Sequence, residues 1–366
     1  MTAATHAPAP GSVRHAVITG TGHHVPERVV TNADLEAILG TSVEPFVSET
    51  LGIRERRFCA PHESTVDLCL PAAHAALAMA GVSPQAIDLL IVATDTPEYI
   101  SPATSSALHA RLGTTRAATF DVNAGCAGYV TALDVAAKYL RADDRYARIL
   151  VVGAYAMSKY LDLHDKKTAT IFADGAGATL VEARDVPGVL ASELYADGSF
   201  CHGMGVFAGG TAEPITEAVV RDGVRNRLRF VEKYPREVNE EGWPRLARSV
   251  LARAGRDVND VACWLWTQVN RSTIEVVMAR LGVPMARAHT VMHKWGYTGA
   301  ACLPMALDDA VRAGRLGDGD LVMLTGSGAG LAMGCVALEW RAPQAPEGVA
   351  AAGSPAAGAP ARAEGR

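Results

Sequence analysis

The chain has 366 residues, 49% of them hydrophobic and 20% charged, which allows a large buried core in two domains or in one fold made of two halves. A net charge of −5 excludes the basic balance of a nucleic-acid-binding protein. The seven cysteines are scattered and contain no Cys-x-x-Cys pair, which argues against a disulfide framework or a zinc site and favours a reducing cytoplasm.

Both ends of the chain are rich in Ala, Pro and Gly. We expect residues 1–12 and 342–366 to be disordered, because such segments cannot bury a core. The first residues carry no basic segment followed by an apolar run, and no apolar stretch reaches the roughly 18 residues that cross a bilayer. The sequence therefore predicts a soluble, cytoplasmic protein without a membrane or nucleic acid as partner.

Strand-like and helical runs alternate along the chain, which predicts a layered α/β architecture. The expected strands are 15–22, 88–96, 148–156, 178–183, 262–269 and 320–328. The expected helices are 66–81, 129–142, 245–254, 272–282 and 302–314.

The chain also repeats itself. Residues 91–113 and 265–282 both run from an apolar strand, through a polar turn, into a helix that ends in Ala-Arg-Leu-Gly. Each is followed by a short strand, a glycine-containing turn, another helix, and an apolar strand with a Gly-Ala-Gly segment. The repeat predicts an N-terminal half over 13–186 and a C-terminal half over 187–341, whose equivalent turns meet in the middle. We place the functional site there.

The stretch DVNAGCAGYV (121–130) sets a cysteine between small residues, after an apolar strand and before a helical pattern. Cys126 is therefore expected in the first turn of a helix, where the helix dipole and unpaired backbone N–H groups favour a thiolate. Gly125 and Gly128 let a substrate approach the backbone closely. Taken alone, the cysteine is equally well interpreted as a buried structural residue.

Several segments together resemble the thiolase superfamily, and most closely ketoacyl-ACP synthase III. They are GTGHHVPERVVTN (20–32), GIRERRF (52–58), TDTPEYISPATSSALHARLG (94–113), DVNAGCAGYVTALDVA (121–136), FADGAGATLV (172–181), WTQVN (266–270), KWGYTGAACLP (294–304) and GSGAGLAMG (326–334). The resemblance implies a thiolase-like, five-layered α-β-α-β-α fold from two duplicated halves. It also implies a homodimer and an acyl-thioester intermediate on Cys126.

In that family the nucleophile works with a histidine and an asparagine, and both positions differ here. The histidine position is Thr267 and the asparagine position is Tyr297. Their hydroxyls are neutral donors that could hold an oxyanion or an enolate, but neither is a competent base near pH 7. The alternative is that both residues only fill space in a degenerate site.

Other groups can replace the missing functions. His293 or His202 would serve as an alternative base if either side chain reached the cavity. The resemblance assigns the oxyanion hole of the acyl-Cys step to the backbone N–H groups of Cys126 and Ala329.

Donor recognition also departs from the family pattern. In the family a tryptophan stacks on the adenine of coenzyme A, and its position is occupied by Phe46 here. The resemblance assigns donor binding to Phe46, Arg54, Lys166, Asn270 and Arg271. These differences weaken the case for coenzyme A, so the acyl donor is an acyl-CoA or the phosphopantetheine of an acyl carrier protein, with no metal and no permanently bound cofactor. The basic stretch 221–236 either meets an acidic carrier protein or forms a solvated helix face.

The leading hypothesis is a ketoacyl-ACP synthase III-like acyltransferase that loads Cys126 and passes the acyl group to a second substrate. Claisen-type carbon–carbon bond formation in a specialised, secondary-metabolite or lipid pathway is preferred. The alternative within this class is a non-decarboxylating N- or O-acyltransferase. A catalytically silent partner subunit of an active homologue is the alternative of another class, although the retained Cys126 argues against it.

Overall fold

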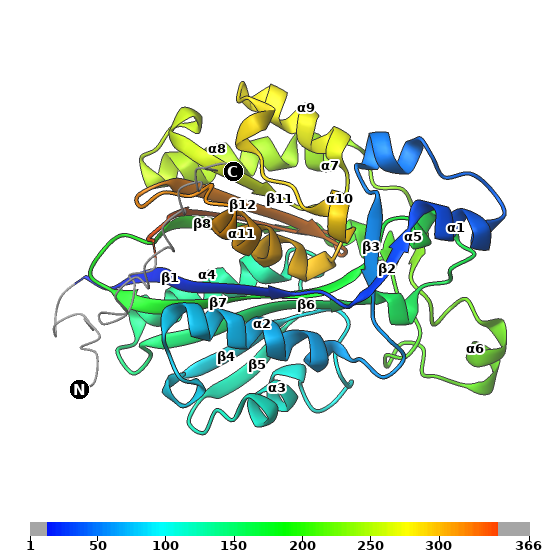
Figure 1. Ribbon diagram of the computed structural model, residues 1–366, viewed down its shortest axis with the longest axis horizontal. Helices are drawn as coiled ribbons and strands as arrows, with labels where there is room; N and C mark the ends of the chain where they lie inside the picture. Colours follow the sequence, from blue (N-terminus) through cyan, green and yellow to red (C-terminus); the bar gives the residue numbers. More distant parts are fainter. Residues whose placement is uncertain (1–12, 343–366) are drawn as a thin grey trace, which may run out of the picture.

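The computed structural model describes residues 13–342 and consists of two β-sheets and three layers of helices (Figure 1). A five-stranded sheet has the order β1-β7-β6-β4-β5, and a four-stranded sheet has the order β11-β12-β13-β8. Helices α4 and α11 lie between the sheets, α2 and α3 cover the outer face of the first, and α8 and α9 cover that of the second. The predicted α-β-α-β-α fold is confirmed. Disorder was predicted for residues 1–12 and 342–366, and all of these except residue 342 lie outside the described residues.

The secondary-structure elements have the following bounds. The first sheet contains β1 (His15–His24), β4 (Leu89–Ala93), β5 (Ala118–Val122), β6 (Arg148–Ala156) and β7 (Asp174–Arg184). The second contains β8 (Val189–Ala196), β11 (Val261–Trp266), β12 (Leu321–Gly328) and β13 (Ala332–Glu339). The layer helices are α2 (Thr65–Ala80), α3 (Thr104–Leu112), α4 (Gly128–Ala142), α8 (Gly242–Ala254), α9 (Arg271–Leu281) and α11 (Cys302–Arg312).

Shorter elements complete the chain. The strands are β2 (Arg28–Thr31), β3 (Glu55–Phe58), β9 (Met204–Gly205) and β10 (Arg229–Phe230). The helices are α1 (Asn32–Leu39), α5 (Lys166–Ala169), α6 (Glu217–Asp222), α7 (Glu237–Glu240), α10 (Met292–Trp295) and a π-helical turn, η1 (Phe46–Leu51). Single 3₁₀ turns are Pro84–Ala86, Met157–Tyr160, Gly198–Phe200, Val258–Asp260, Met285–Arg287 and Gly299–Ala301.

The two sheets are built from related halves. In the first, β4 is parallel to β6, and β6 is antiparallel to β7; in the second, β11 is parallel to β12, and β12 is antiparallel to β13. One strand of the predicted repeat is much shorter than expected. The short strand predicted after residue 282 is only an isolated bridge between Ala288 and Trp264, whereas its counterpart β5 pairs with β4 over five residues.

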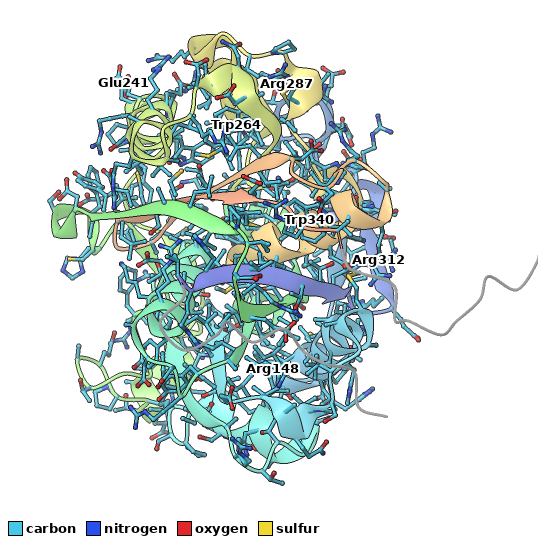
Figure 2. All side chains as sticks on the ribbon, turned by 90° about the vertical axis from the view of Figure 1, so that its left-hand side faces the viewer. Arg148, Glu241, Trp264, Arg287, Arg312 and Trp340 are labelled. Carbon is cyan, nitrogen blue, oxygen red and sulfur yellow. The ribbon has the colours of Figure 1, made fainter. Side chains whose placement is uncertain are left out.

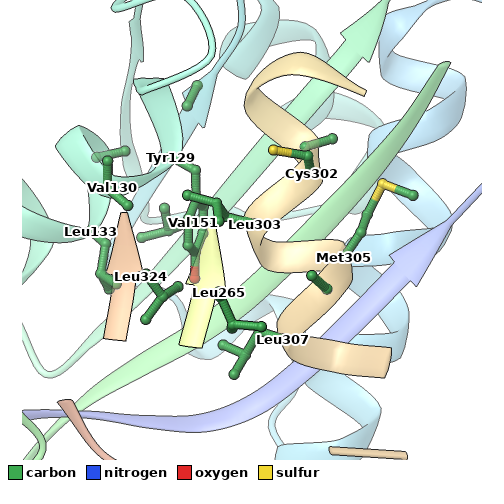
Figure 3. Packing of buried hydrophobic residues seen from close by; sticks show 14 of the residues in the cluster. Tyr129, Val130, Leu133, Val151, Leu265, Cys302, Leu303, Met305, Leu307 and Leu324 are labelled. Atoms are coloured by element: carbon green, nitrogen blue, oxygen red, sulfur yellow. The ribbon is translucent and has the colours of Figure 1, made fainter. Parts of the chain in front are cut away.

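The two central helices are enclosed by sheets on both sides, which explains why their sequences are apolar around much of their circumference. Figure 3 shows Tyr129, Val130 and Leu133 of α4 close to Leu324 of β12, with Leu303 and Leu307 of α11 nearby; all of these side chains are buried. Because α4 and α11 are enclosed in this way, the residues at their N-terminal ends lie inside the protein.

A separate core lies on the outer side of the second sheet, beneath α8 and α9. The ring of Trp266 stacks on Trp264 at a centroid distance of 5.3 Å and on Trp243 at 5.4 Å. Figure 2 shows Trp264 and Trp340 in the interior and Glu241 at the periphery, in agreement with the full burial of both tryptophans. These aromatic contacts fix α8 and β11, the strand that leads into the site.

Candidate functional site

Cys126 lies between β5 and α4, in the strand-turn-helix arrangement predicted for it. The residue is buried, with 1% of its surface exposed. The helix begins at Gly128 and Ala127 is its N-cap, so Cys126 lies one residue before the cap and not in the first turn as expected. The thiol is therefore enclosed at the N-terminal end of a central helix.

The protonation state expected for this thiol was wrong. Burial raises the pKa of Cys126 well above its ordinary value, and the nearby charge of Asp95 raises it further, whereas hydrogen bonds with Tyr297 and with its own backbone N–H lower it. Desolvation disfavours the charged form of a thiol, and here it outweighs the helix dipole. Cys126 rests as a protonated thiol, so acyl transfer requires a group that takes a proton.

The main chain around Cys126 is packed against the turn between β12 and β13. A Cβ on Gly328 would lie 2.2 Å from the nitrogen of Cys126, and a Cβ on Gly125 would lie 2.9 Å from the nitrogen of Ala329. Both contacts require glycine, and Gly125 also has a positive φ of 52°. The structure thus brings together the two segments predicted to supply the oxyanion hole, Cys126 and Ala329.

Tyr297 is held in place by its own main chain. Its N–H donates to the carbonyl of Ile171 at 3.0 Å, and its carbonyl accepts from the N–H of Ala173 at 2.8 Å. The ring, 2% exposed, packs against Phe172 at a centroid distance of 5.5 Å. The preceding Gly296 has a φ of 69°, which suits glycine and turns the chain towards the site.

The Tyr297 hydroxyl is hydrogen-bonded to the thiol of Cys126. Burial raises the pKa of Tyr297 well above its ordinary value, and the charge of Cys126 raises it further. The hydroxyl therefore stays protonated near neutral pH and acts as a donor, not as a base. The structure brings these two predicted site residues into direct contact.

Thr267 directly follows β11 and is 1% exposed. Its N–H donates to the carbonyl of Thr325 at 3.0 Å, and its hydroxyl oxygen accepts from the N–H of Ser327 at 2.9 Å. Thr267 thus continues the β11–β12 pairing to the edge of the sheet. Because the hydroxyl is an acceptor in this contact, its proton remains available to another group.

Neither histidine considered as an alternative base is placed beside the thiol. His293 is exposed on α10, and partial burial and the charges of Lys294 and Arg54 lower its pKa. His202 is exposed, and its ring packs against Phe207 at 6.2 Å. The charges that act on Cys126 come instead from Asp95 and Cys302.

The residues assigned to donor binding are near the surface, around η1 and α9, which pack together. Phe46 is 56% exposed, Arg54 is exposed, and Lys166 donates to the carbonyl of Ser42 at 2.7 Å. Arg271 donates to Glu275 at 2.9 Å and borders Gly52 beside η1. The side-chain oxygen of Asn270 accepts from the N–H of Ser272 at 2.9 Å, so a helix cap already explains this residue.

The basic stretch 221–236 is not a helix face. Helix α6 ends at Asp222, and the chain continues through a loop and the two-residue strand β10. Arg225 pairs with Glu213 and with Asp222, and Arg227 donates to main-chain carbonyls. Part of this positive charge is therefore neutralised within the chain, while Lys233 and Arg236 are exposed.

Asp95 was missed in the sequence. It follows β4, at the edge of the first sheet where β5 leads to Cys126, and its Oδ1 is shielded from solvent without a hydrogen-bond partner in the described part of the chain. Burial raises the pKa of Asp95 to about 6, against the lowering effect of its own backbone N–H. A polar residue directly after a buried parallel strand is the signal that could have identified it, because ligand sites form at that edge.

Within residues 13–342 no helix is long and apolar enough to cross a membrane. In the same residues, no three His, Cys, Asp or Glu side chains cluster so as to hold a metal ion.

Comparisons with known proteins agree on one family. Residues 120–198 match the family model for 3-oxoacyl-[acyl-carrier-protein (ACP)] synthase III, and residues 251–340 match the model for its C-terminal part. The chain is 37% identical to the β-ketoacyl-[acyl-carrier-protein] synthase III of Syntrophomonas wolfei, covering 88% of this chain and 97% of the relative. It is 39% identical to the enzyme of the same name from Roseiflexus castenholzii, covering 89% and 98%.

Solved structures give the same result. The 3-oxoacyl-[acyl-carrier-protein] synthase III of Aquifex aeolicus is 32% identical, with a TM-score of 0.80 over 89% of this chain and 100% of that chain. The priming β-ketosynthase of the R1128 polyketide biosynthetic pathway is 31% identical, with a TM-score of 0.83 over 91% and 98%.

Proposed function

The chain belongs to the β-ketoacyl-[acyl-carrier-protein] synthase III family, and on that premise we propose that it carries acyl groups on Cys126 and transfers them to a second substrate. Membership makes it a ketoacyl-synthase-like acyltransferase, and Claisen-type condensation is typical of such enzymes. The proposal assigns the nucleophile to Cys126 and the carbonyl-oxygen site to the N–H groups of Cys126 and Ala329.

One observation supports this assignment: a hydroxyl donor and two main-chain segments meet around one sulfur. The Cys126 main chain packs against the turn that holds Ala329, and the Tyr297 hydroxyl is hydrogen-bonded to the thiol. Donors fixed in a water-excluded site stabilise the charge that develops on a carbonyl oxygen. A buried cysteine with only a packing role would not require this arrangement.

The same proposal treats Thr267 and Tyr297 as replacements of the family's catalytic histidine and asparagine. Their hydroxyls would hold an oxyanion or an enolate without taking a proton. Such a change on an intact scaffold suits a specialised biosynthetic pathway. Similarity to a priming ketosynthase of a polyketide pathway supports that assignment.

The donor is an acyl-CoA or the phosphopantetheine arm of an acyl carrier protein, and we propose that it enters beside the exposed Phe46 and Lys166. A homodimer is also proposed. In the described sheet, β5 is an edge strand that pairs only with β4, which leaves it available to the same strand of a second copy.

Intact-mass spectrometry tests the acyl-Cys126 intermediate. The wild-type protein is incubated with acetyl-CoA, octanoyl-CoA and an acyl-loaded carrier protein, and the expected result is a gain of one acyl group. Cys126→Ala should gain none. Cys302→Ala is the matched control, because Cys302 is also buried and begins the other central helix, yet the proposal gives it no acyl group.

A second candidate function follows from the burial of the sulfur. Cys126 is enclosed and protonated at rest, and the large Tyr297 side chain lies against it. These features also suit a silent subunit that stabilises an active homologue. Absence of an adduct with every donor, together with co-purification of a homologous chain, would favour that function.

A further inference from the structure

Two adjacent strands bring Asp95 and the segment that carries Cys126 to the same edge of the first sheet. β4 pairs in parallel with β5, and the N–H of Thr94 donates to the carbonyl of Val122 at 3.1 Å, which continues this pairing past the end of both strands. Ala93 lies against the start of α4, since a Cβ on Gly128 would be 3.3 Å from the Cβ of Ala93. Asp95 therefore follows β4 near the N-terminal end of α4, which Cys126 precedes.

The main chain around Asp95 is rigid. The Thr96 hydroxyl oxygen accepts from the N–H of Ala156 at 2.9 Å, and the Thr65 hydroxyl donates to the carbonyl of Thr96 at 2.6 Å. These bonds tie the segment after β4 to β6 and α2. One oxygen of the carboxylate is left out of this network, because the enclosed Oδ1 has no partner among the described residues.

An enclosed carboxylate oxygen without a hydrogen-bond partner is costly, so the position of Asp95 calls for a functional reason. The titratable groups that its charge reaches are Cys126 before α4, Tyr155 at the end of β6, and Tyr160 in the following turn. Its effect on Cys126 acts through space and not through a hydrogen bond, whereas Tyr297 contacts the sulfur directly.

We propose that Asp95 is the general base that takes a proton from the second substrate as that substrate attacks acyl-Cys126. The second substrate is accordingly a nucleophile with a removable hydrogen on its attacking atom, such as an amine, a hydroxyl or an acidic carbon, and it loses no carboxylate. This inference rests on the proposed function, because it needs the acyl group on Cys126.

The step balances without a co-reactant. The electron pair of the attacking atom forms a bond to the carbonyl carbon, its proton passes to the carboxylate of Asp95, and the carbonyl oxygen becomes an oxyanion. When the tetrahedral intermediate collapses, the carbon–sulfur bond breaks and the Cys126 thiolate takes the proton back from Asp95. Acyl-Cys126 and the protonated nucleophile become the acylated product, free thiol and carboxylate.

Electrostatics favours this class of acceptor over a malonyl group. Decarboxylation leaves its electron pair on carbon as an enolate and needs no base, so Asp95 would have no proton to take. A malonyl carboxylate and the enolate that follows are both anionic, and an enclosed carboxylate repels them in this low-dielectric site. A neutral nucleophile enters without that penalty and uses the carboxylate.

The test begins with protein acetylated on Cys126 by acetyl-CoA and freed of excess donor. Loss of the acetyl group is then followed by intact mass with two probes, methoxyamine, which stays neutral while Asp95 titrates, and malonyl-CoA with measurement of released carbon dioxide. Wild type is compared with Asp95→Asn and Asp95→Glu. Asp134→Asn is the matched control, because Asp134 is also a buried acid of this half but bonds to Ser192 and Lys138 away from the sulfur.

Wild-type protein and Asp134→Asn should lose acetyl to methoxyamine roughly 10² to 10⁴ times faster than Asp95→Asn does. The wild-type rate should fall as the pH drops through about 6, where Asp95 becomes protonated, and Asp95→Asn should lack this pH dependence. Asp95→Glu, which keeps the carboxylate, should retain it. Malonyl-CoA should give no carbon dioxide above background.

Three results would overturn the inference. If acetylated Asp95→Asn discharges at the wild-type rate with the wild-type pH profile, Asp95 is not the base, although the acyl-Cys function stands. If malonyl-CoA releases carbon dioxide and removes the acetyl group from Cys126 faster than methoxyamine does, the second substrate is not a neutral nucleophile of the proposed kind. If wild type takes up no acyl group from acetyl-CoA, octanoyl-CoA or the acyl-loaded carrier protein, the proposed function fails and this inference fails with it. Asp95→Asn should fold, since it removes a charge whose enclosed Oδ1 has no partner among the described residues, and thermal melts check this.

Discussion

Gly328 leaves no room for a side chain against Cys126: a Cβ at this position would lie 2.2 Å from the Cys126 nitrogen and 3.0 Å from its Cα. Both neighbours are main-chain atoms, which cannot move aside as a flexible side chain can. The position of Cys126 after β5 therefore depends on a glycine that comes from the other half of the chain.

Gly328→Ala should displace the Cys126 main chain and reduce acyl transfer by about 10²-fold or more, because a shift of roughly 1 Å at a reacting group costs that much. The rate of acyl transfer measures it. Gly198→Ala is the control, since a Cβ at that glycine meets nothing within 4 Å. Equal transfer rates in the two variants would contradict the tight packing described for Gly328.

Tyr297→Phe should lower turnover by about 10² to 10³, the range for loss of one oxyanion donor, while Cys126 still becomes acylated. The hydrogen bond from Tyr297 lowers the pKa of Cys126, so its removal should also slow alkylation of the thiol by iodoacetamide at a fixed pH. Tyr129→Phe is the control, because that buried hydroxyl bonds to Thr179 at 2.9 Å. Unchanged turnover in Tyr297→Phe would remove the donor role.

Thr267→Val should destabilise the protein by about 1–3 kcal/mol, because the buried N–H of Ser327 would lose its acceptor. The two side chains are of similar size, so the effect reports on the hydroxyl. Denaturant unfolding measures it, with Thr267→Ser, which keeps the acceptor, as the control. A stability equal to wild type would mean that water or another group replaces the Thr267 oxygen.

Asp309 provides a pH-dependent contribution to stability. Burial by itself raises the pKa of Asp309, but hydrogen bonds from His289 and Lys294 outweigh it and bring the pKa to about 2. The folded pKa lies below the unfolded one, so the stabilisation is present above the unfolded pKa and disappears as the pH falls through about 2.

Asp309→Asn should therefore cost about 1 kcal/mol at pH 7, a value that allows for solvent screening, and the cost should vanish at the acidic end. Unfolding curves of both proteins across acidic and neutral pH measure the difference. A difference that does not change with pH would show that the ion pairs of Asp309 add nothing to stability.

The fold could be predicted largely from periodicity. The helix expected over 129–142 is α4, Gly128–Ala142, and the one expected over 302–314 is α11, Cys302–Arg312. Long amphipathic or buried runs carry enough residues to identify them. The strand expected after residue 282 could not be judged in this way, because two or three extended residues at a sheet edge leave no pattern.

Site residues could be proposed from the sequence only where the residue type itself suggests a chemical role. Cys126 and Tyr297 were identified by sequence, and they are in contact. The pKa of Cys126 was predicted in the wrong direction, because the helix dipole can be inferred from position, whereas desolvation depends on the packing of both halves. Asp95 escaped notice for the same reason, since an aspartate after a strand looks like a turn residue until its burial is known.

Cys126 belongs to one duplicated half, whereas Thr267, Tyr297 and Ala329 belong to the other. This division separates two kinds of evolutionary change. On the proposed assignment, mutations at Thr267 and Tyr297 alter how a reaction intermediate is held while the first half continues to provide the sulfur. A change in these two hydroxyl donors therefore leaves Cys126 in place.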